Sequence, residues 1–545
     1  MSEPAAFPLN STSKTDREIV AHLLDEPAAE DPQASPASTI MDDVRGILAL
    51  PRLGNQDDLV RAGANSLEVL RLAARLRSRL GSSLTASDVY RLRTIEAISA
   101  YCSDWAGSAA QLPSIQEGDA APAPLSHAQR RFWLAEMTDP GAADNLIVLS
   151  FALTGALKPE SLVEAVADVV KLHPVLRTTY SWLGEAPIQM ILPPEACAVV
   201  VEHVGRPSQA AGVGLQALAE AVTADWWQQP FSLEDEALIR VRLCRLGADQ
   251  HLLCLAVHHI AFDGWSESVL LADLQAAYKA RLSGQDPPTA RRLSYSQYSS
   301  WEATRLADWT QRDLPFWRTE LVTAPAPFLP APTGTGEARR LETVFEVDSD
   351  TVGRLERVSA DRGGPVLAAL VAGAARALAN VFHAPELALG SVTAGRFDPA
   401  LESVIGCFIN PFVVKLSSAP DGEPAALLDQ AVTRVVSTLK HVNTPFDELV
   451  REFAHARKRH PWFQVLVILQ GQPPSGSLYG GVAVKPVRVR PPTTANELMM
   501  EAIPTRDGSW RIVTSWRDDG ITATQGRRLR DELRTALAEI SGLAR

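Results

Sequence analysis

Apolar and polar positions along the chain predict a mixture of buried strands and amphipathic helices. Short, strongly apolar runs predict strands at 146–153, 252–257 and 464–469. Apolar residues at intervals of three and four predict helices at 160–172, 365–380 and 524–540. These segments all follow residue 122, so we expect a large α/β region there. At this length it exceeds one ordinary core, which predicts two lobes with a site between them.

Composition divides the chain into five parts. Residues 1–36 are rich in Pro, Ala, Ser and acidic residues, and 106–122 resemble them, so both predict flexible linkers. The predicted domains are a compact helical unit at 37–105, one lobe at 123–300 and a second lobe at 301–545.

The small unit at 37–105 shows its clearest helical pattern directly after Ser66. Leu67, Leu70 and Ala74 share one stripe, which Val69, Ala73, Leu76 and Leu80 widen. Gly81 follows this pattern and predicts its end. A last helix is expected at 94–101, so the unit is predicted to be all-α.

Charge and cysteine content exclude several classes of protein. The chain has 545 residues and a formal net charge of −12, with no dense basic stretch interleaved with aromatics, so we expect no nucleic-acid partner. Its 5 cysteines form no close pair, which argues against a disulfide framework or a zinc site. No apolar run is long enough to span a membrane, and no signal peptide is evident, so a cytoplasmic protein is expected.

Ser66 stands where a small-residue turn, Gly63-Ala64-Asn65, meets a helix N-terminus. The positive end of a helix dipole favours an anion such as a phosphodiester, although N-capping is the commonest role of such a serine. The segment resembles the phosphopantetheine attachment site of peptidyl carrier proteins, with Ala64 in place of a second glycine. This resemblance implies a four-helix bundle with 4′-phosphopantetheine on Ser66, whose thiol holds an acyl chain as a thioester.

A second motif follows the strand predicted at 252–257. His258 and His259 at a strand end point to opposite faces, so one can face a cavity while the other braces the loop. Asp263 can fix the turn or pair with a buried arginine, and Gly264 permits close backbone approach to a narrow ligand. No further ligands at metal-binding spacing are present, so no metal site is expected.

The His-His-x-x-x-Asp-Gly motif resembles the signature of condensation domains in non-ribosomal peptide synthetases. Further segments similar to that family follow in its order at 126–134, 173–180, 295–301, 405–410, 441–447 and 457–464. The resemblance implies a two-lobed, chloramphenicol-acetyltransferase-like fold with a tunnel between the lobes. It implies that His259 is catalytic and supported by His258, that Gly264 lines the donor passage, and that Asp263 is structural. We expect Arg396 to be its partner, in preference to Arg177.

The expected reaction is amide-bond formation between an acyl thioester on Ser66 and an aminoacyl thioester on a downstream acceptor carrier, in secondary-metabolite synthesis such as that of an antibiotic or siderophore. His259 either removes a proton from the acceptor amine or orients it, and both roles need neutral imidazole. Residues 9–17, which include Lys14, resemble the tail of an adenylation domain, so an upstream adenylation domain and a phosphopantetheinyl transferase are expected partners. We expect no second carrier after the large region, so the acceptor is expected to come from elsewhere, and a monomer is expected.

Three alternatives stay open at this point. The same superfamily also performs epimerisation, ester formation and heterocyclisation, and fold alone does not fix the chemistry. A silent recruitment module would keep the fold but commonly lacks the second His or the Gly, and both are present as His259 and Gly264. A free coenzyme-A acyltransferase would not need the attached carrier.

Overall fold

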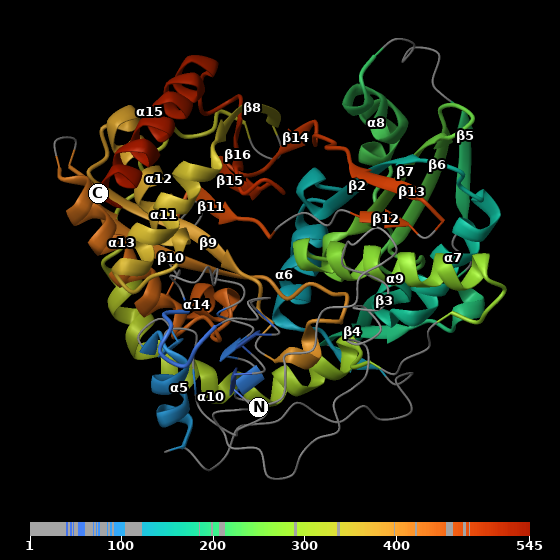
Figure 1. The fold of residues 1–545 in the computed structure, drawn as a ribbon, viewed down its shortest axis with the longest axis horizontal. Coiled ribbons are helices and arrows are strands. Elements are labelled where there is room, and N and C mark those ends of the chain that lie inside the picture. Colours follow the sequence, from blue (N-terminus) through green and yellow to red (C-terminus); the bar gives the residue numbers. More distant parts are fainter. Residues whose placement is uncertain are drawn as a thin grey trace, which may run out of the picture.

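The computed structural model describes two lobes and part of the small N-terminal unit (Figure 1). It covers residues 122–544 except 185, 198–199, 206–212, 288–291, 335–337, 397, 420–421, 454–461, 472–475 and 479, together with scattered residues of 40–103. Ser66, the helix end at Gly81 and the segment containing Lys14 lie outside the described residues.

The small unit has a core of its own. Val69, Leu72, Ala73 and Leu76, from the helix predicted after Ser66, are buried. They share one cluster with Ile95 and Ile98 of α5 (Ile95–Ser103), the last helix predicted for this unit. The described residues therefore bear out a helical packing unit upstream of the lobes.

The first lobe is a six-stranded sheet in the order β12-β13-β2-β7-β6-β5. Its strands are β2 (Leu146–Thr154), β5 (Val201–Gly205), β6 (Ile239–Arg245), β7 (Gln250–His258), β12 (Gly476–Leu478) and β13 (Val482–Pro486). Its helices are α6 (His127–Thr138), α7 (Pro159–Leu172), α8 (Leu215–Thr223) and α9 (Gly264–Leu282). A three-stranded sheet beside it contains β1 (Ala123–Pro124), β3 (Thr178–Leu183) and β4 (Ala186–Ile191).

Strand β7 is buried on both faces, which explains its continuous apolar run. Leu253, Leu255 and Val257 join the core cluster that includes residues of α7 and α9. The intervening Leu252 and Cys254 join a second cluster with α8. Successive side chains of β7 point to opposite faces of the sheet, so this one strand contributes to two separate hydrophobic clusters.

The second lobe is a seven-stranded mixed sheet in the order β10-β9-β11-β15-β16-β8-β14. Its strands are β8 (Ala338–Val347), β9 (Glu386–Thr393), β10 (Asn410–Ser417), β11 (Val465–Leu469), β14 (Thr493–Thr494), β15 (Leu498–Pro504) and β16 (Trp510–Arg517). Its helices are α11 (Ser349–Asp361), α12 (Val366–Phe382), α13 (Pro424–Leu439), α14 (Phe446–Phe453) and α15 (Ala523–Ser541). α12 is almost entirely buried among its neighbours, and a Cβ at Gly373 would lie 2.8 Å from Leu537 of α15.

The lobes exchange segments instead of following one another along the chain. The expected division after residue 300 lies inside one continuous helix, α10 (Tyr295–Val322). Residues 401–408 leave the second lobe after β9 and pack in the core of the first. β12 and β13 also come late in the sequence, yet β13 pairs antiparallel with β2. Figure 1 shows β12 and β13 together within the first lobe, away from β11, β15 and β16.

The described residues contain neither a single membrane-spanning helix nor a cluster of metal-binding side chains. No single helix among them is long and apolar enough to cross a membrane, although α11 and α12 together, bent by 105°, meet the length and composition criteria. Within the same residues no three His, Cys, Asp or Glu side chains are grouped so that they could hold a metal ion.

Candidate active site

The two histidines at the end of β7 face different surroundings, as alternation in a strand predicts. His258 is buried, and its Nδ1 accepts a hydrogen bond from the backbone N–H of Ile260 at 3.1 Å. The neutral ring must then carry its proton on Nε2, which lies 3.3 Å from Glu136 Oε2. His258 therefore braces the turn through both ring nitrogens.

Glu136 of α6 anchors this arrangement. Its carboxyl also accepts hydrogen bonds from the Gly141 N–H at 2.7 Å and the Asn145 side-chain amide at 2.8 Å. Burial acts to raise the pKa of Glu136, but the hydrogen bonds from His258, Gly141 and Asn145 hold the pKa below its ordinary value. Glu136 thus stays ionised and fixes the orientation of His258.

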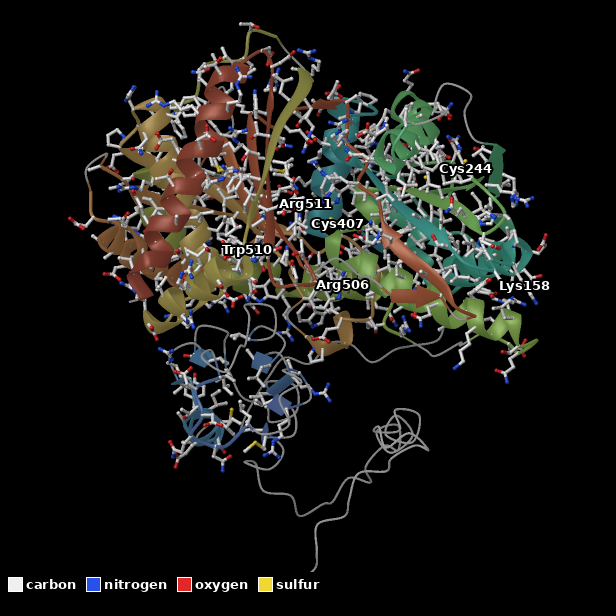
Figure 2. The ribbon with its side chains drawn as sticks, turned by 45° about the horizontal axis from the view of Figure 1, so that its top comes forward. Lys158, Cys244, Cys407, Arg506, Trp510 and Arg511 are labelled. Atoms are coloured by element: carbon white, nitrogen blue, oxygen red, sulfur yellow. The ribbon has the colours of Figure 1, made fainter. Side chains whose placement is uncertain are left out.

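His259 begins the short turn η6 (His259–Ala261) and retains some exposed surface. Its ring stacks on Phe132 of α6, with centroids 4.3 Å apart and planes inclined by 15°. Its Nδ1 lies 3.8 Å from the Sγ of Cys407. The two contacts come from different parts of the chain, and Figure 2 shows Cys407 between the lobes.

Burial, with the nearby charge of Arg131, lowers the pKa of His259 to about 4. A hydrogen bond with its own backbone opposes this shift in part. The ring is therefore neutral at pH 7. Its Nε2 bonds to no described residue and is available to a substrate.

The Asp263 carboxyl is committed to other groups. It is 1% exposed and caps α9 by accepting hydrogen bonds from the backbone N–H and hydroxyl of Ser266, at 2.9 and 2.7 Å. Its two oxygens lie 3.0 and 3.2 Å from Arg396 Nη2, and the Phe408 N–H donates to it at 3.1 Å. Arg396, not Arg177, is therefore its partner.

Arg396 in turn holds the segment that crosses between the lobes. Its Nη1 donates to the carbonyls of Leu401 and Val404, at 2.5 and 2.7 Å, and its guanidinium lies 4.1 Å from the centre of the Phe408 ring. We call Asp263, Ser266, Arg396 and Phe408 the clasp. The clasp ties the start of α9 to the crossing segment and places Cys407 beside His259.

Gly264 is exposed at the start of α9, and an added Cβ would approach only the Gln470 side chain, at 3.4 Å. The backbone therefore does not require glycine here, and the short distance to Gln470 places the start of α9 against the end of β11. His259 and Glu267 keep exposed surface, yet burial raises the pKa of Glu267 to about 7.

Asp447 of α14 and His127 of α6 show the same combination of features. Burial raises the pKa of Asp447 and lowers that of His127 to about 4, and both side chains keep exposed surface. The charge of Arg131 acts on both Asp447 and His259. Arg131 therefore contributes to the electrostatic surroundings of both α14 and His259.

Sequence reasoning singled out His258, His259, Asp263, Gly264 and Arg396, and the structure brings all five together. It did not single out Phe132, Cys407, Glu136 or Glu267. Phe132 and Cys407 lie inside motif segments, but only the fold shows that their side chains meet the imidazole. Glu136 and Glu267 carried no signal in the sequence beyond their place on helices.

Two family models match the chain. The model described as Condensation domain matches residues 120–541, and that described as Phosphopantetheine attachment site matches residues 38–102. The chain therefore belongs to the condensation-domain family of acyltransferases. Its second match places a phosphopantetheine carrier ahead of that domain, the arrangement of a carrier–condensation pair of a non-ribosomal peptide synthetase, with covalently attached 4′-phosphopantetheine as cofactor.

Curated relatives agree with both assignments. A probable non-canonical nonribosomal peptide synthetase, CymA of Salinispora arenicola, is 30% identical over 502 residues, 88% of this chain and 6% of its own length. The phosphinothricin tripeptide synthetase PhsB of Streptomyces viridochromogenes is 31% identical over 450 residues, 78% of this chain and 37% of its own length. The chain thus spans well under two thirds of these relatives.

Solved structures show the same fold. The X-domain from teicoplanin biosynthesis superposes with a TM-score of 0.66 at 22% identity, covering 79% of this chain and 97% of that one. The first condensation domain of the CDA synthetase gives a TM-score of 0.64 at 20% identity, covering 77% and 97%. The predicted two-lobed fold is therefore confirmed.

Proposed function

We propose that this chain joins two thioester-bound substrates by an amide bond, with the donor acyl chain on Ser66 and the acceptor amine beside His259. One observation carries the proposal: a neutral imidazole with an uncommitted Nε2 lies in an accessible but desolvated position between the lobes, in a chain that also carries a phosphopantetheine attachment domain.

Phosphopantetheine, when bound to Ser66, supplies the thiol that holds the donor as a thioester. We propose that the arm passes Gly264, because any side chain there would fill the narrow gap between α9 and Gln470, where a Cβ would already lie 3.4 Å from the Gln470 side chain. Nε2 of His259 accepts a hydrogen bond from the neutral acceptor amine and aims the nitrogen at the thioester carbonyl. As the C–N bond forms the C–S bond breaks, the nitrogen loses one proton, and the sulfur leaves as a thiol.

The low pKa of His259 distinguishes between its two possible roles. A ring with a pKa of about 4 holds a proton poorly, whereas an α-amine titrates near 8 and is partly neutral at pH 7. Orientation of the amine by a hydrogen bond therefore fits His259 better than complete removal of its proton.

The partners follow from this reaction. We propose that the acceptor arrives on a downstream carrier, that an upstream adenylation domain loads the donor, and that a phosphopantetheinyl transferase modifies Ser66. We further propose that the chain acts as a cytoplasmic monomer. We propose residues 37–105 as the carrier, with 1–36 and 106–122 as linkers, and 123–300 and 301–545 as the main parts of the two lobes. α10 spans the division between these two parts, and residues 401–408 and β13 return from the second part to the first lobe.

The test uses the full chain loaded on Ser66 by a phosphopantetheinyl transferase from acyl-coenzyme A. An aminoacyl thioester on a separate carrier serves as acceptor, and mass spectrometry follows the peptide. We expect His259→Ala to slow product formation by about 100-fold or more, and Ser66→Ala to abolish loading. His203→Ala, an exposed histidine on β5, is the control and should be unaffected.

Each rival predicts a different product. A configurational change without a new bond would indicate epimerisation, and binding without product would indicate recruitment. Wild-type rates in His259→Ala, or mass gain in Ser66→Ala, would reject the assignment.

A further inference from the structure

A buried thiol beside the imidazole of His259 takes no part in the proposed reaction. Cys407 is 0% exposed, and its Sγ lies 3.8 Å from Nδ1 of His259. Burial raises the pKa of this thiol to about 12 and lowers that of His259 to about 4, so both groups are neutral at pH 7. Cys407 is therefore not a thiolate paired with an imidazolium, and what it can offer the ring is a weak hydrogen bond.

The backbone around Cys407 is fixed by separate anchors. The N–H of Gly406 donates to Ser266 Oγ of the clasp at 3.1 Å, and the clasp accepts a second backbone hydrogen bond, also of 3.1 Å, from the residue after Cys407. The Tyr295 hydroxyl donates to the carbonyl of Cys407 itself, and a Cβ at Gly406 would overlap the Tyr295 ring. The fold, and not His259, therefore sets where the Cys407 side chain starts and which way it leaves the backbone.

The stack on Phe132 does not by itself fix where Nε2 of His259 points. A flip of the ring by 180° about the Cβ–Cγ bond exchanges Nδ1 with Cδ2 and Nε2 with Cε1, yet it keeps the ring in the same plane. Both orientations can therefore stack on Phe132 equally well. Cys407 lies at one edge of the ring and meets a nitrogen in one orientation but a C–H group in the other. The thiol thus distinguishes two orientations that the stack leaves equal.

We propose that Cys407 is a positioning residue for His259, whose Nδ1–H donates a hydrogen bond to the Cys407 sulfur. A neutral ring carries one proton, so a proton on Nδ1 leaves the lone pair on Nε2. This inference deepens the proposed function, because it says what directs that lone pair at the acceptor amine. The orientation and the tautomer of the ring are, however, properties of the protein alone, and they can be measured without turnover.

The kinetic test uses the full chain loaded on Ser66 and one common acceptor. Cys407→Ala removes the sulfur, Cys407→Val removes it with a bulkier side chain, and Cys407→Ser restores a polar group at the same edge of the ring. Cys254→Ala is the matched control, because Cys254 is also buried and lies on β7, but its Sγ contacts Ser150 at 3.4 Å.

We expect Cys407→Ala and Cys407→Val to lower kcat by about 3- to 10-fold with little change in the KM for the acceptor, since the thiol acts on the ring. Cys407→Ser should recover most of this loss, and Cys254→Ala should keep the wild-type kcat. A wild-type kcat in folded Cys407→Ala and Cys407→Val proteins would overturn the proposal. Equal losses in all three Cys407 variants would assign the effect to packing and would overturn it too.

Nitrogen-15 NMR of the chain labelled at histidine reads the ring directly, because protonated and unprotonated ring nitrogens have well separated shifts. The signals of His259 are assigned by their loss in His259→Ala. We expect a protonated Nδ1 and an unprotonated Nε2 in the wild type and in Cys254→Ala, and a mixture of both tautomers in Cys407→Ala. A wild-type ring with its proton on Nε2, or ring signals that Cys407→Ala leaves unchanged, would contradict the proposed hydrogen bond.

The two readouts separate this inference from the proposed function. An Nδ1–H tautomer that depends on Cys407, in a chain that makes no amide, would reject the proposed function and keep the assignment of Cys407. Amide formation by the wild type, with kcat and ring signals unchanged in Cys407→Ala, would do the reverse. Circular dichroism checks the fold of each variant, and Cys407→Val supplies the same comparison if the smaller side chain destabilises the protein.

Discussion

At the scale of single residues, the site depends on what surrounds one imidazole. Phe132 contacts one ring face, the Cys407 thiol lies near Nδ1, and Arg131 adds positive charge nearby. His259 could be identified from sequence because the four fixed residues of the His-His-x-x-x-Asp-Gly motif are all present. Phe132 could not be identified in the same way, because an aromatic residue on an amphipathic helix is usually a core residue, and only the fold shows its stacking.

Phe132 should act as a positioning residue for His259. Stacked aromatic pairs contribute about 0.5–1.5 kcal/mol, so Phe132→Ala should lower kcat by about 2- to 10-fold with little change in KM. Phe132→Tyr keeps the stacking face and should restore kcat. Leu134→Ala, 50% exposed on the same helix, is the control. An unchanged kcat in a folded Phe132→Ala protein would show that the stack does not orient the ring.

The fall in rate at acidic pH should be caused by protonation of the acceptor amine, not by protonation of His259. Because burial lowers the pKa of His259 to about 4, the ring stays neutral through pH 5, while the acceptor amine loses its lone pair below its own pKa. The acidic limb of the rate profile should therefore move with acceptor basicity, and a weakly basic amine should react at a constant rate between about pH 7 and 5. An acidic limb with an apparent pKa near 6.5 that stays the same for acceptors of different basicity would contradict this prediction.

Folding must be followed in the same experiment. The unfolded chain binds protons at His127 and His259 near 6.5, whereas the folded chain does so near 4. Both groups therefore make stability fall as pH decreases from about 6.5 toward 4. Circular dichroism at each pH separates loss of fold from loss of rate.

At the scale of elements, helices and strands could be predicted where their own sequence pattern determines them, and could not be where distant residues do. β2, β7 and β11 and helices α7, α12 and α15 match their predicted segments within a few residues, because a strand or helix that is strongly patterned depends mainly on its own sequence. The crossing of residues 401–408 into the first lobe could not be predicted, since its apolar side chains do not indicate which core they enter.

We expect the clasp to stabilise the packing of residues 401–408 in the first lobe. Asp263→Ala would leave the Arg396 side chain, 2% exposed, without its counter-ion, and breaking a buried pair in this way costs about 3–5 kcal/mol. Thermal unfolding should show a large loss of stability, with Asp249→Ala, an exposed aspartate, as the control.

The double variant Asp263→Ala with Arg396→Met tests the cause of that loss. Removing both charges should be less harmful than removing the aspartate alone, because no unpaired ion remains. If Asp263→Ala were folded, fully stable and fully active, the structural role of Asp263 would be rejected.

At the scale of the whole molecule, three connections among the described residues cross between the lobes. α10 passes between them, the segment with Cys407 enters the first lobe, and β13 extends the sheet of the first lobe beside β2. His259 belongs to the first lobe, while β11 and Gln470, opposite α9, belong to the second. The width of the passage therefore depends on how these connections hold the lobes, which no local sequence pattern encodes.

A further contact between the lobes lies at Asp144 in the turn η1 (Ala143–Asn145) of the first lobe. Its carboxyl accepts hydrogen bonds from the Thr494 hydroxyl at 3.2 Å, the Ala495 N–H at 2.8 Å and the Asn496 amide at 3.0 Å. The three donors belong to one short segment at and after β14, an edge strand of the second lobe. Asp144 thus concentrates several interlobe hydrogen bonds on one side chain.

Asp144→Ala should loosen the lobes without disturbing either core. Three donors lose their acceptor, which costs about 1–3 kcal/mol if they stay buried and less if water reaches them. We expect faster hydrogen exchange at 143–145 and 494–496, and slower amide formation because His259 and the opposing lobe lose alignment. Asp139→Ala, exposed near the end of α6, should change neither property. Faster exchange with an unchanged rate would show that this contact holds the lobes but does not set the passage, whereas unchanged exchange on both sides would show that the other connections suffice.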